Sequence, residues 1–150
     1  MASTFHKLLF HVIFSTKDRK PWLSEEIMNR LIPYIGAMLR NRDVTLLAGN
    51  GHRDHIHLFF SAKPSASIPE LVRVIKSESS GWLKAEFQGI PHFAWQRGYA
   101  IFTVGMSQTG QLKKYIENQF DHHRHRTFEE EYKSFLEKYE IEYEEEFVFG

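Results

Sequence analysis

The stretch that most constrains the fold of this chain is a short run of alternating residue types, Asp54-His55-Ile56-His57-Leu58-Phe59-Phe60. Its aliphatic positions alternate with His55, His57 and Phe59, which is the period of a β-strand. The two imidazoles therefore lie on one face, about 7 Å apart along the strand at a rise of about 3.3 Å per residue. Two ring nitrogens at this spacing can bind one metal ion, although a sheet surface can also carry two histidines that bind nothing.

The size and composition of the chain indicate one domain, residues 1–150, with a real hydrophobic core. The chain has 150 residues, of which 42% are hydrophobic, and this is enough to bury such a core. No apolar run approaches the roughly 18 residues that a membrane span needs, and residues 1–7 carry no cleavable signal pattern. The sequence has no cysteine, which excludes disulfides and thiolate metal sites. We expect a cytoplasmic protein without membrane association.

The net charge of zero hides an asymmetry along the chain. Residues 1–127 contain 17 Lys and Arg against 10 Asp and Glu, whereas residues 128–150 contain 2 Lys and 9 Glu. We therefore distinguish a core, residues 1–127, from an acidic C-terminal tail, residues 128–150. A basic core suits a polyanionic partner, although the tail can simply balance the charge of the core.

The order of predicted elements indicates an α+β fold. Strands are predicted at residues 7–14, 44–48, 54–60 and 99–104. Three helices are predicted from their start signals: an N-cap at Ser24, a capping box at Ser67 and a second capping box at Thr127. A further helix is predicted from about Leu112 to Arg124. Pro33 should kink the first helix. The order β-α-β-β-α-β-α with a C-terminal helical tail predicts a ferredoxin-like (RRM-like) antiparallel sheet with helices on one face. The first and third strands are commonly central in such a sheet, which would place the histidine pair in its middle.

The helix predicted from Leu112 to Arg124 carries a second group of chemically useful residues. Tyr115 and Gln119 are four residues apart and share a helix face. A tyrosine with a pKa of about 10 is a weak nucleophile, but a divalent metal that polarises a phosphodiester makes its attack feasible. Gln119 would add an oxygen ligand to His55 and His57 and leave positions open for phosphate oxygens and water. This mixed nitrogen and oxygen set suits Mg²⁺ or Mn²⁺.

A further histidine-rich stretch, His122, His123 and His125, follows Gln119. Partly charged histidines are favourable at the C-terminal end of a helix dipole. We interpret this stretch as a polar helix end rather than as a second metal site.

Taken together, His55-Ile56-His57 and Tyr115-Ile116-Glu117-Asn118-Gln119 resemble the two motifs of the HUH endonucleases. In particular, they resemble the single-tyrosine transposases of the insertion sequence 200/605 family. The likeness continues through residues 11–14, 51–54 and 128–132, and so covers nearly the whole chain. A lone His-x-His is a weak signal, but the two motifs in this order and at this separation are a strong one.

The resemblance implies a function, a cofactor and partners. It implies a homodimer whose active sites can be composed in trans, with the tyrosine helix of one subunit against the histidine pair of the other. It implies a metal held by His55, His57 and Gln119, with Tyr115 as the nucleophile. The substrate would be single-stranded DNA with hairpin ends, cleaved to a 5′-phosphotyrosine and a 3′-hydroxyl, and the strands would be rejoined without an external energy source.

The basic residues that we expect to contact DNA are candidates drawn from the whole core. Single strands bind in basic grooves with stacking aromatic rings. The residues chosen are Arg53, Arg73, Lys76, Lys113 and Lys114.

Other functions agree with parts of the sequence. A non-catalytic RRM-like protein that binds nucleic acid would use the same sheet, and a host-adapted relative that processes repeated hairpin sequences would carry the same motifs. A phosphoesterase with paired histidine motifs is disfavoured, because the chain has one His-x-His. For the tail we hypothesise that its apolar side covers the sheet or a partner subunit.

Overall fold

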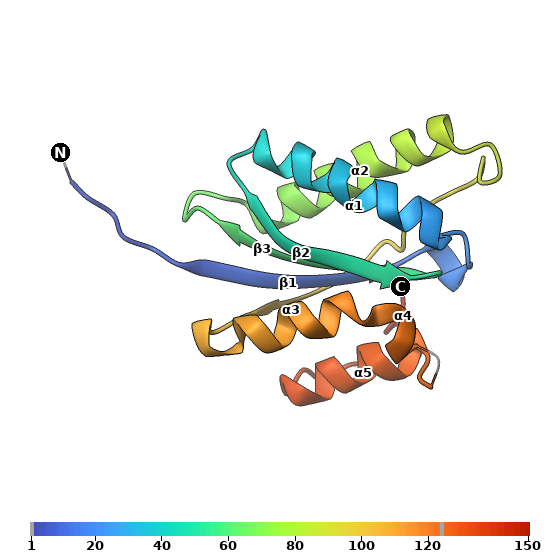
Figure 1. Ribbon diagram of the computed structural model, residues 1–150. Coiled ribbons are helices and arrows are strands. Elements are labelled where there is room, and N and C mark those ends of the chain that lie inside the picture. Colours follow the sequence, from blue (N-terminus) through green and yellow to red (C-terminus); the bar gives the residue numbers. More distant parts are fainter. Residues whose placement is uncertain (1, 124) are drawn as a thin grey trace.

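A computed structural model describes residues 2–123 and 125–150. It shows the predicted order of strands and helices, with additional short helices after the last strand (Figure 1). The strands and α-helices are β1 (Leu8–Ser15), α1 (Glu25–Arg40), β2 (Thr45–His52), β3 (His55–Ala62), α2 (Ile68–Glu86), β4 (Ala100–Thr103), α3 (Thr109–Glu117), α4 (Gln119–His122) and α5 (Phe128–Lys138). Two 3₁₀ turns, Lys17–Arg19 and Met106–Gln108, complete the list. None of the helices in the described ranges is long and apolar enough to cross a membrane.

The four strands form one antiparallel sheet in the order β2-β3-β1-β4. This order, with α1 and α2 as the connections, is that of the predicted ferredoxin-like fold. The first and third strands are central, as expected. Between them Val12 lies opposite Leu58, and Ile13 lies opposite His57.

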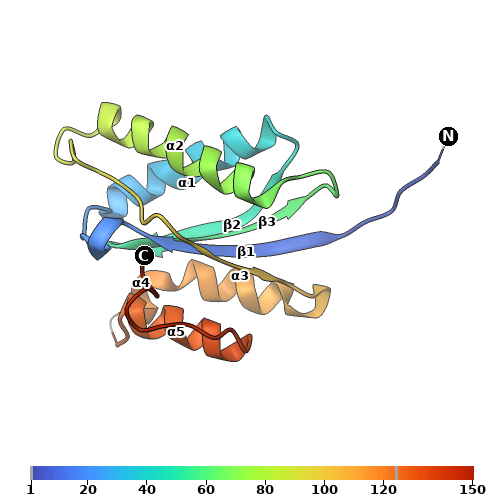
Figure 2. The same cartoon turned by 180° about the vertical axis from the view of Figure 1, so that it is seen from behind.

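One face of the sheet is covered by α1 and α2, which lie side by side on it in both views (Figures 1 and 2). The aliphatic residues of β3 point to this face and join those of β1 and the two helices in the main core. Buried examples are Val12, Leu58, Leu31 and Ile75. The alternation within β3 therefore gives one entirely apolar face, because successive side chains of a strand point to opposite sides.

The other face is covered by the helices that follow β4, namely α3, α4 and α5 (Figure 1). Phe128, Tyr132 and Leu136 of α5 pack with Ile13 and Phe102 of the sheet. The acidic tail thus covers the sheet of its own chain, which is one of the two locations hypothesised for it.

Two details of the helices differ from the sequence prediction, although the second helix begins after Ser67 as expected. Ser24 and Thr127 cap their helices as predicted, but the Ser67 side chain makes no cap hydrogen bond, and Glu70 is bonded to Arg73 instead. The single helix predicted after Leu112 is divided into α3 and α4 at Asn118.

The division at Asn118 is accompanied by a contact from the sheet. The side-chain amide of Asn50 on β2 donates a hydrogen bond of 3.1 Å to the carbonyl of Glu117. A carbonyl at a helix end needs such a partner from outside the helix. Sequence spacing within the helix contains no information about this contact.

Candidate active site

The histidine pair of β3 lies at the centre of the second face, beneath α3, α4 and α5. His55 and His57 are fully buried, and their ring centroids are 5.1 Å apart. Because Ile56 between them points to the main core, both imidazoles point away from it. The strand therefore presents two rings to the same small volume, as its alternation predicted.

Each ring is oriented by a hydrogen bond on its Nδ1 atom. Nδ1 of His55 is 2.8 Å from Oδ1 of Asp54, and Nδ1 of His57 is 2.8 Å from Nε2 of His11. With Nδ1 engaged, Nε2 of each histidine faces the opposite direction, toward the helices. Such outer contacts fix ring orientation in metal sites.

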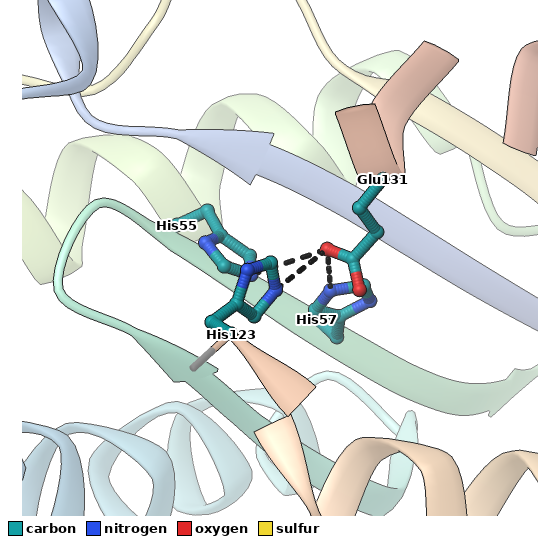
Figure 3. Close-up of side chains that lie close together, drawn as sticks. All are labelled: His55, His57, His123 and Glu131. Atoms are coloured by element: carbon teal, nitrogen blue, oxygen red, sulfur yellow. Dashed lines mark hydrogen bonds and ion pairs between the residues drawn. The ribbon is translucent and has the colours of Figure 1, made fainter. Parts of the chain in front are cut away.

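A carboxylate from the tail lies at the point where the Nε2 atoms meet. Glu131 of α5 is fully buried, and its Oε1 is 3.0 Å from Nε2 of His57 and 3.3 Å from Nε2 of His55. His123 approaches the same oxygen with its Nε2 at 3.1 Å. Figure 3 shows these four side chains converging from β3, α5 and the end of α4.

Sequence reasoning named Glu131 only as part of a resembling stretch and gave it no role, although the sequence carries a signal for it. The apolar side of the tail helix is marked by Phe128, Tyr132 and Phe135. Position 131 is three residues after the first of these and four before the last, so it lies on the same side. A carboxylate on the buried side of a helix is rarely placed there without a partner.

Gln119, the predicted third ligand, is the first residue of α4 and lies against the pair. It is fully buried, and its Oε1 is 2.9 Å from Nε2 of His55 and 3.0 Å from Nε2 of His123. Its amide nitrogen donates to Oε2 of Glu131 at 3.1 Å. The structure thus brings together the three predicted ligands, His55, His57 and Gln119; their role in metal binding stays a prediction.

Tyr115 reaches the same group from α3. Its hydroxyl donates a hydrogen bond to Oε2 of Glu131 and lies 3.2 Å from Nε2 of His122. Its ring centroid is 5.8 Å from that of His57. Within the single chain Tyr115 therefore faces the histidine pair of its own subunit, and the trans arrangement implied by the resemblance stays a prediction.

The histidine-rich stretch after Gln119 is part of this site, contrary to our interpretation of it as a polar helix end. His123 lies among the candidate metal ligands, and His122 contacts Tyr115. His125, by contrast, is exposed. Among the described residues the stretch forms no separate metal site, because His123 belongs to the group around His55.

The donor atoms fit a metal ion. One atom from each of His55, His57, His123 and Glu131 lies within 4.8 Å of the other three, and the carboxamide oxygen of Gln119 lies beside them. Three imidazole nitrogens with carboxylate and amide oxygens are a usual set of ligands for a divalent transition-metal ion such as Mn²⁺. The residues present therefore fit the divalent cation that the sequence predicted.

Burial and charge act in opposite directions on the histidines. Burial lowers the pKa of His57, and it lowers the pKa of His11 well below the usual value. Burial also acts to lower the pKa of His55, but the hydrogen bonds and charges of Asp54 and Glu131 outweigh it and raise the pKa to about 9. The neutral state favoured for His57 is the state in which an imidazole binds a metal.

Burial and neighbouring charges also shift the pKa values of Glu131 and Tyr115. Burial acts to raise the pKa of Glu131, but the neighbouring histidines, led by His57, outweigh it and lower this pKa. Burial, followed by the charge of Glu131, raises the pKa of Tyr115. The site therefore contains a carboxylate anion, and the phenol beside it keeps its proton in the absence of an added cation.

Two of the five predicted DNA contacts lie across the sheet from the site. Arg73 and Lys76 are on α2, and Arg73 is paired with Glu70. The ammonium of Lys76 donates three hydrogen bonds of 2.7–3.1 Å to the carbonyls of residues 96–98. Lys76 therefore fastens the chain before β4 to α2.

The other three predicted contacts lie nearer to the site. Lys113 and Lys114 are on α3 with Tyr115, and Arg53 is exposed at the turn that precedes His55. These three residues adjoin elements that form the site. The structure thus separates the candidates into a pair behind the sheet and a group on the elements that form the site.

A cavity of about 320 Å³ opens beside Tyr115. Its lining combines aromatic rings, amides and cationic groups, including Phe135, Tyr139, Gln108, Gln111, Arg126 and Lys138. A pocket of this chemistry can hold a base by stacking and a phosphate by charge. Sequence reasoning did not find it, because its walls come from α3, α5 and the segment after β4.

Comparison with known proteins gives consistent matches. The model of the family described as "Transposase IS200 like" matches residues 4–119. The ISDra2 transposase TnpA of Deinococcus radiodurans is 27% identical over 124 residues, covering 77% of this chain and 86% of that protein. The transposase for insertion sequence element IS200 of Salmonella typhimurium is 25% identical over 126 residues, covering 81% and 82% of the two chains.

Two solved structures share the fold. A crystal structure of a Deinococcus radiodurans protein assigned as a transposase has a TM-score of 0.65 and 28% identity, and the match covers 79% of this chain and 95% of that one. A REP-associated tyrosine transposase bound to a REP hairpin has a TM-score of 0.60 over 82% of this chain and 73% of that one; at 15% identity it shows the fold alone. The family match ends at Gln119, so α5 and Glu131 lie beyond it.

Proposed function

The chain belongs to the IS200-like transposase family, and on this premise we propose that it is a metal-dependent endonuclease and strand transferase of single-stranded DNA. The observation that carries the proposal is the position of Tyr115. Its hydroxyl reaches the buried group that also contains His55, His57 and Gln119. Residues from two motifs about sixty positions apart thus meet at one point, as a nucleophile and a metal site must.

The proposed ligands of the cation are His55, His57 and Gln119. When bound, a cation such as Mg²⁺ or Mn²⁺ withdraws negative charge from the phosphate that is attacked. The chain itself supplies the orientation. Asp54 and His11 hold the two imidazoles through Nδ1, and the sheet holds their backbone rigid.

The proposed reaction exchanges one phosphate ester for another. Tyr115 Oη forms a bond to the phosphorus while the bond from phosphorus to the 3′-oxygen breaks. The phenol loses its proton, and the departing 3′-oxygen gains one. The product is a 5′-phosphotyrosine and a free 3′-hydroxyl. Since the ester bond energy is kept, a second 3′-hydroxyl can reverse the step and join strands.

The proposed substrate is single-stranded DNA with hairpin ends. A structural neighbour is bound to a REP hairpin, and the cavity beside Tyr115 offers rings and cations of the kind that hold a nucleotide. We further propose that two chains form a homodimer, in which the α3 helices can exchange so that the sites are composed in trans. The whole of residues 1–150 then acts as one transposase domain.

The test is a denaturing gel with end-labelled single strands copied from the DNA that flanks the gene, with and without Mn²⁺ or Mg²⁺. We expect a metal-dependent band of DNA linked to protein. Tyr115→Phe should reduce this band at least about 1000-fold, because the nucleophile is lost while the ring contacts remain.

A matched control is Tyr34→Phe, since Tyr34 is on α1 across the sheet and its hydroxyl donates a long hydrogen bond of 3.5 Å to the carbonyl of Glu78. This variant should nick at the wild-type rate. Nicking by Tyr115→Phe at the wild-type rate would overturn the proposal. A gel shift with no covalent product, on strands that contain the hairpin, would favour the non-catalytic binding module.

A further inference from the structure

We infer that Glu131 of α5 is itself a ligand of the metal and positions Tyr115, so that the acidic tail completes the active site. This inference rests on the proposed function. It adds a charged ligand from a segment that lies beyond the family match, whereas His55, His57 and Gln119 all lie within it.

The two carboxylate oxygens of Glu131 face two different groups. Oε1 lies 3.0–3.3 Å from the Nε2 atoms of His55, His57 and His123. Oε2 accepts hydrogen bonds from the Tyr115 hydroxyl and from the amide of Gln119. One side chain therefore connects the imidazole cluster with the nucleophile. Figure 3 shows the contacts of Glu131 with the three histidines.

The burial of Glu131 requires a countercharge. A fully buried carboxylate is costly unless it is paired with a cation. The partners that Glu131 has within residues 2–123 and 125–150 are histidines, an amide and a phenol, so in the metal-free protein the countercharge is a proton held on the imidazole cluster. A divalent cation between Oε1 and the three Nε2 atoms would neutralise the carboxylate and would take the place of the protons that these atoms otherwise share.

The position of Glu131 is fixed by the helix that carries it. Thr127 and Glu130 form a complete capping box at the start of α5. Phe128 and Tyr132, on either side of Glu131, are buried against the sheet. The carboxylate is thus held by packed neighbours, as a pre-formed ligand must be.

The test compares Mn²⁺ binding by the wild-type chain, Glu131→Gln and Glu129→Gln, measured by calorimetry and by the electron paramagnetic resonance of free Mn²⁺. Glu131→Gln keeps the size of the side chain and removes its charge. We expect at least about a tenfold weaker affinity, because a charged ligand is lost. Glu129→Gln removes the same charge from an exposed position of α5 and should bind Mn²⁺ as the wild type does.

If Glu131→Gln does not fold, Glu131→Asp takes its place, since it keeps the charge and shortens the side chain. It should also weaken Mn²⁺ binding, whereas unchanged affinity would overturn the inference. For the positioning role, Glu131→Gln at saturating Mn²⁺ should form the covalent adduct more slowly without a change in KM for DNA. An unchanged rate would show that Glu131 does not position Tyr115.

The outcomes separate this inference from the proposed function. Wild-type affinity for Mn²⁺ in Glu131→Gln, with normal adduct formation by the wild-type chain, would overturn the role of Glu131 and leave the proposed function intact. A wild-type chain that neither binds Mn²⁺ nor forms an adduct would overturn both.

Discussion

The two faces of the sheet are built from the same strands but differ in chemistry. Toward α1 and α2, β3 presents Ile56, Leu58 and Phe60, all fully buried in an apolar core. Toward α3, α4 and α5 it presents His55 and His57, equally buried, among a carboxylate, an amide and a phenol. The first face is held by apolar packing, whereas the second combines apolar packing, as of Phe128 near Ile13, with a polar network in which each group needs a partner.

The difference shows that burial alone does not distinguish a core from a site. His57 and Leu58 are adjacent, and each has no exposed surface. What distinguishes them is the set of helices that covers each face. On the face of α1 and α2, Leu58 belongs to a cluster of buried apolar residues, whereas α5 brings Glu131 to within 3.0 Å of His57.

Among variants that disrupt one face of β3, the largest effect is expected on the polar face, at His57. His57→Ala should lower the rate of metal-dependent nicking at least about 100-fold, because one metal ligand is lost. The rate is measured on the denaturing gel at saturating Mn²⁺, on protein whose folding is verified by circular dichroism. Nicking within a factor of two of the wild type would show that the histidine face is not the catalytic one.

A substitution one residue further on, in the apolar face, should lower stability and leave the nicking rate nearly unchanged. Leu58→Ala should lower the free energy of unfolding by about 2–5 kcal/mol, since it leaves a cavity in the main core. The measurement is urea unfolding without metal. The folded fraction of this variant should still nick at a rate similar to the wild type, and a loss of under about 1 kcal/mol would contradict the assignment of Leu58 to the core.

A smaller effect is expected from the basic residues on the two sides. Lys114→Ala, on α3 with Tyr115, should weaken binding of a single strand about three- to tenfold. The slope of log affinity against log salt concentration should fall by the amount that corresponds to about one phosphate contact. Arg73→Ala, on α2 behind the sheet, should leave binding unchanged. The comparison is made by fluorescence anisotropy at several salt concentrations, and equal losses in both variants would remove the distinction between the faces.

Local pattern was sufficient for much of the fold. The alternation around His55 fixed which residues of β3 face the core, and Ser24 and Thr127 marked true helix starts, since a strand period and a helix cap both involve neighbouring residues. Ser67 also precedes the first residue of its helix, but its side chain makes no cap hydrogen bond, and the Glu70 carboxylate pairs with Arg73. The ring nitrogens of His55 and the carboxamide of Gln119 do meet, as the spacing of the two motifs suggested.

By itself, the sequence determined the sheet, the histidine pair and the helix that carries Tyr115. Only the tertiary structure decided that Glu131 and His123 join them, and that the helix divides at Asn118. The physical reason is the range of the interactions. A strand's two faces follow from its own residues, whereas the partner of a buried carboxylate is set by how a helix seventy-four residues away packs on the sheet.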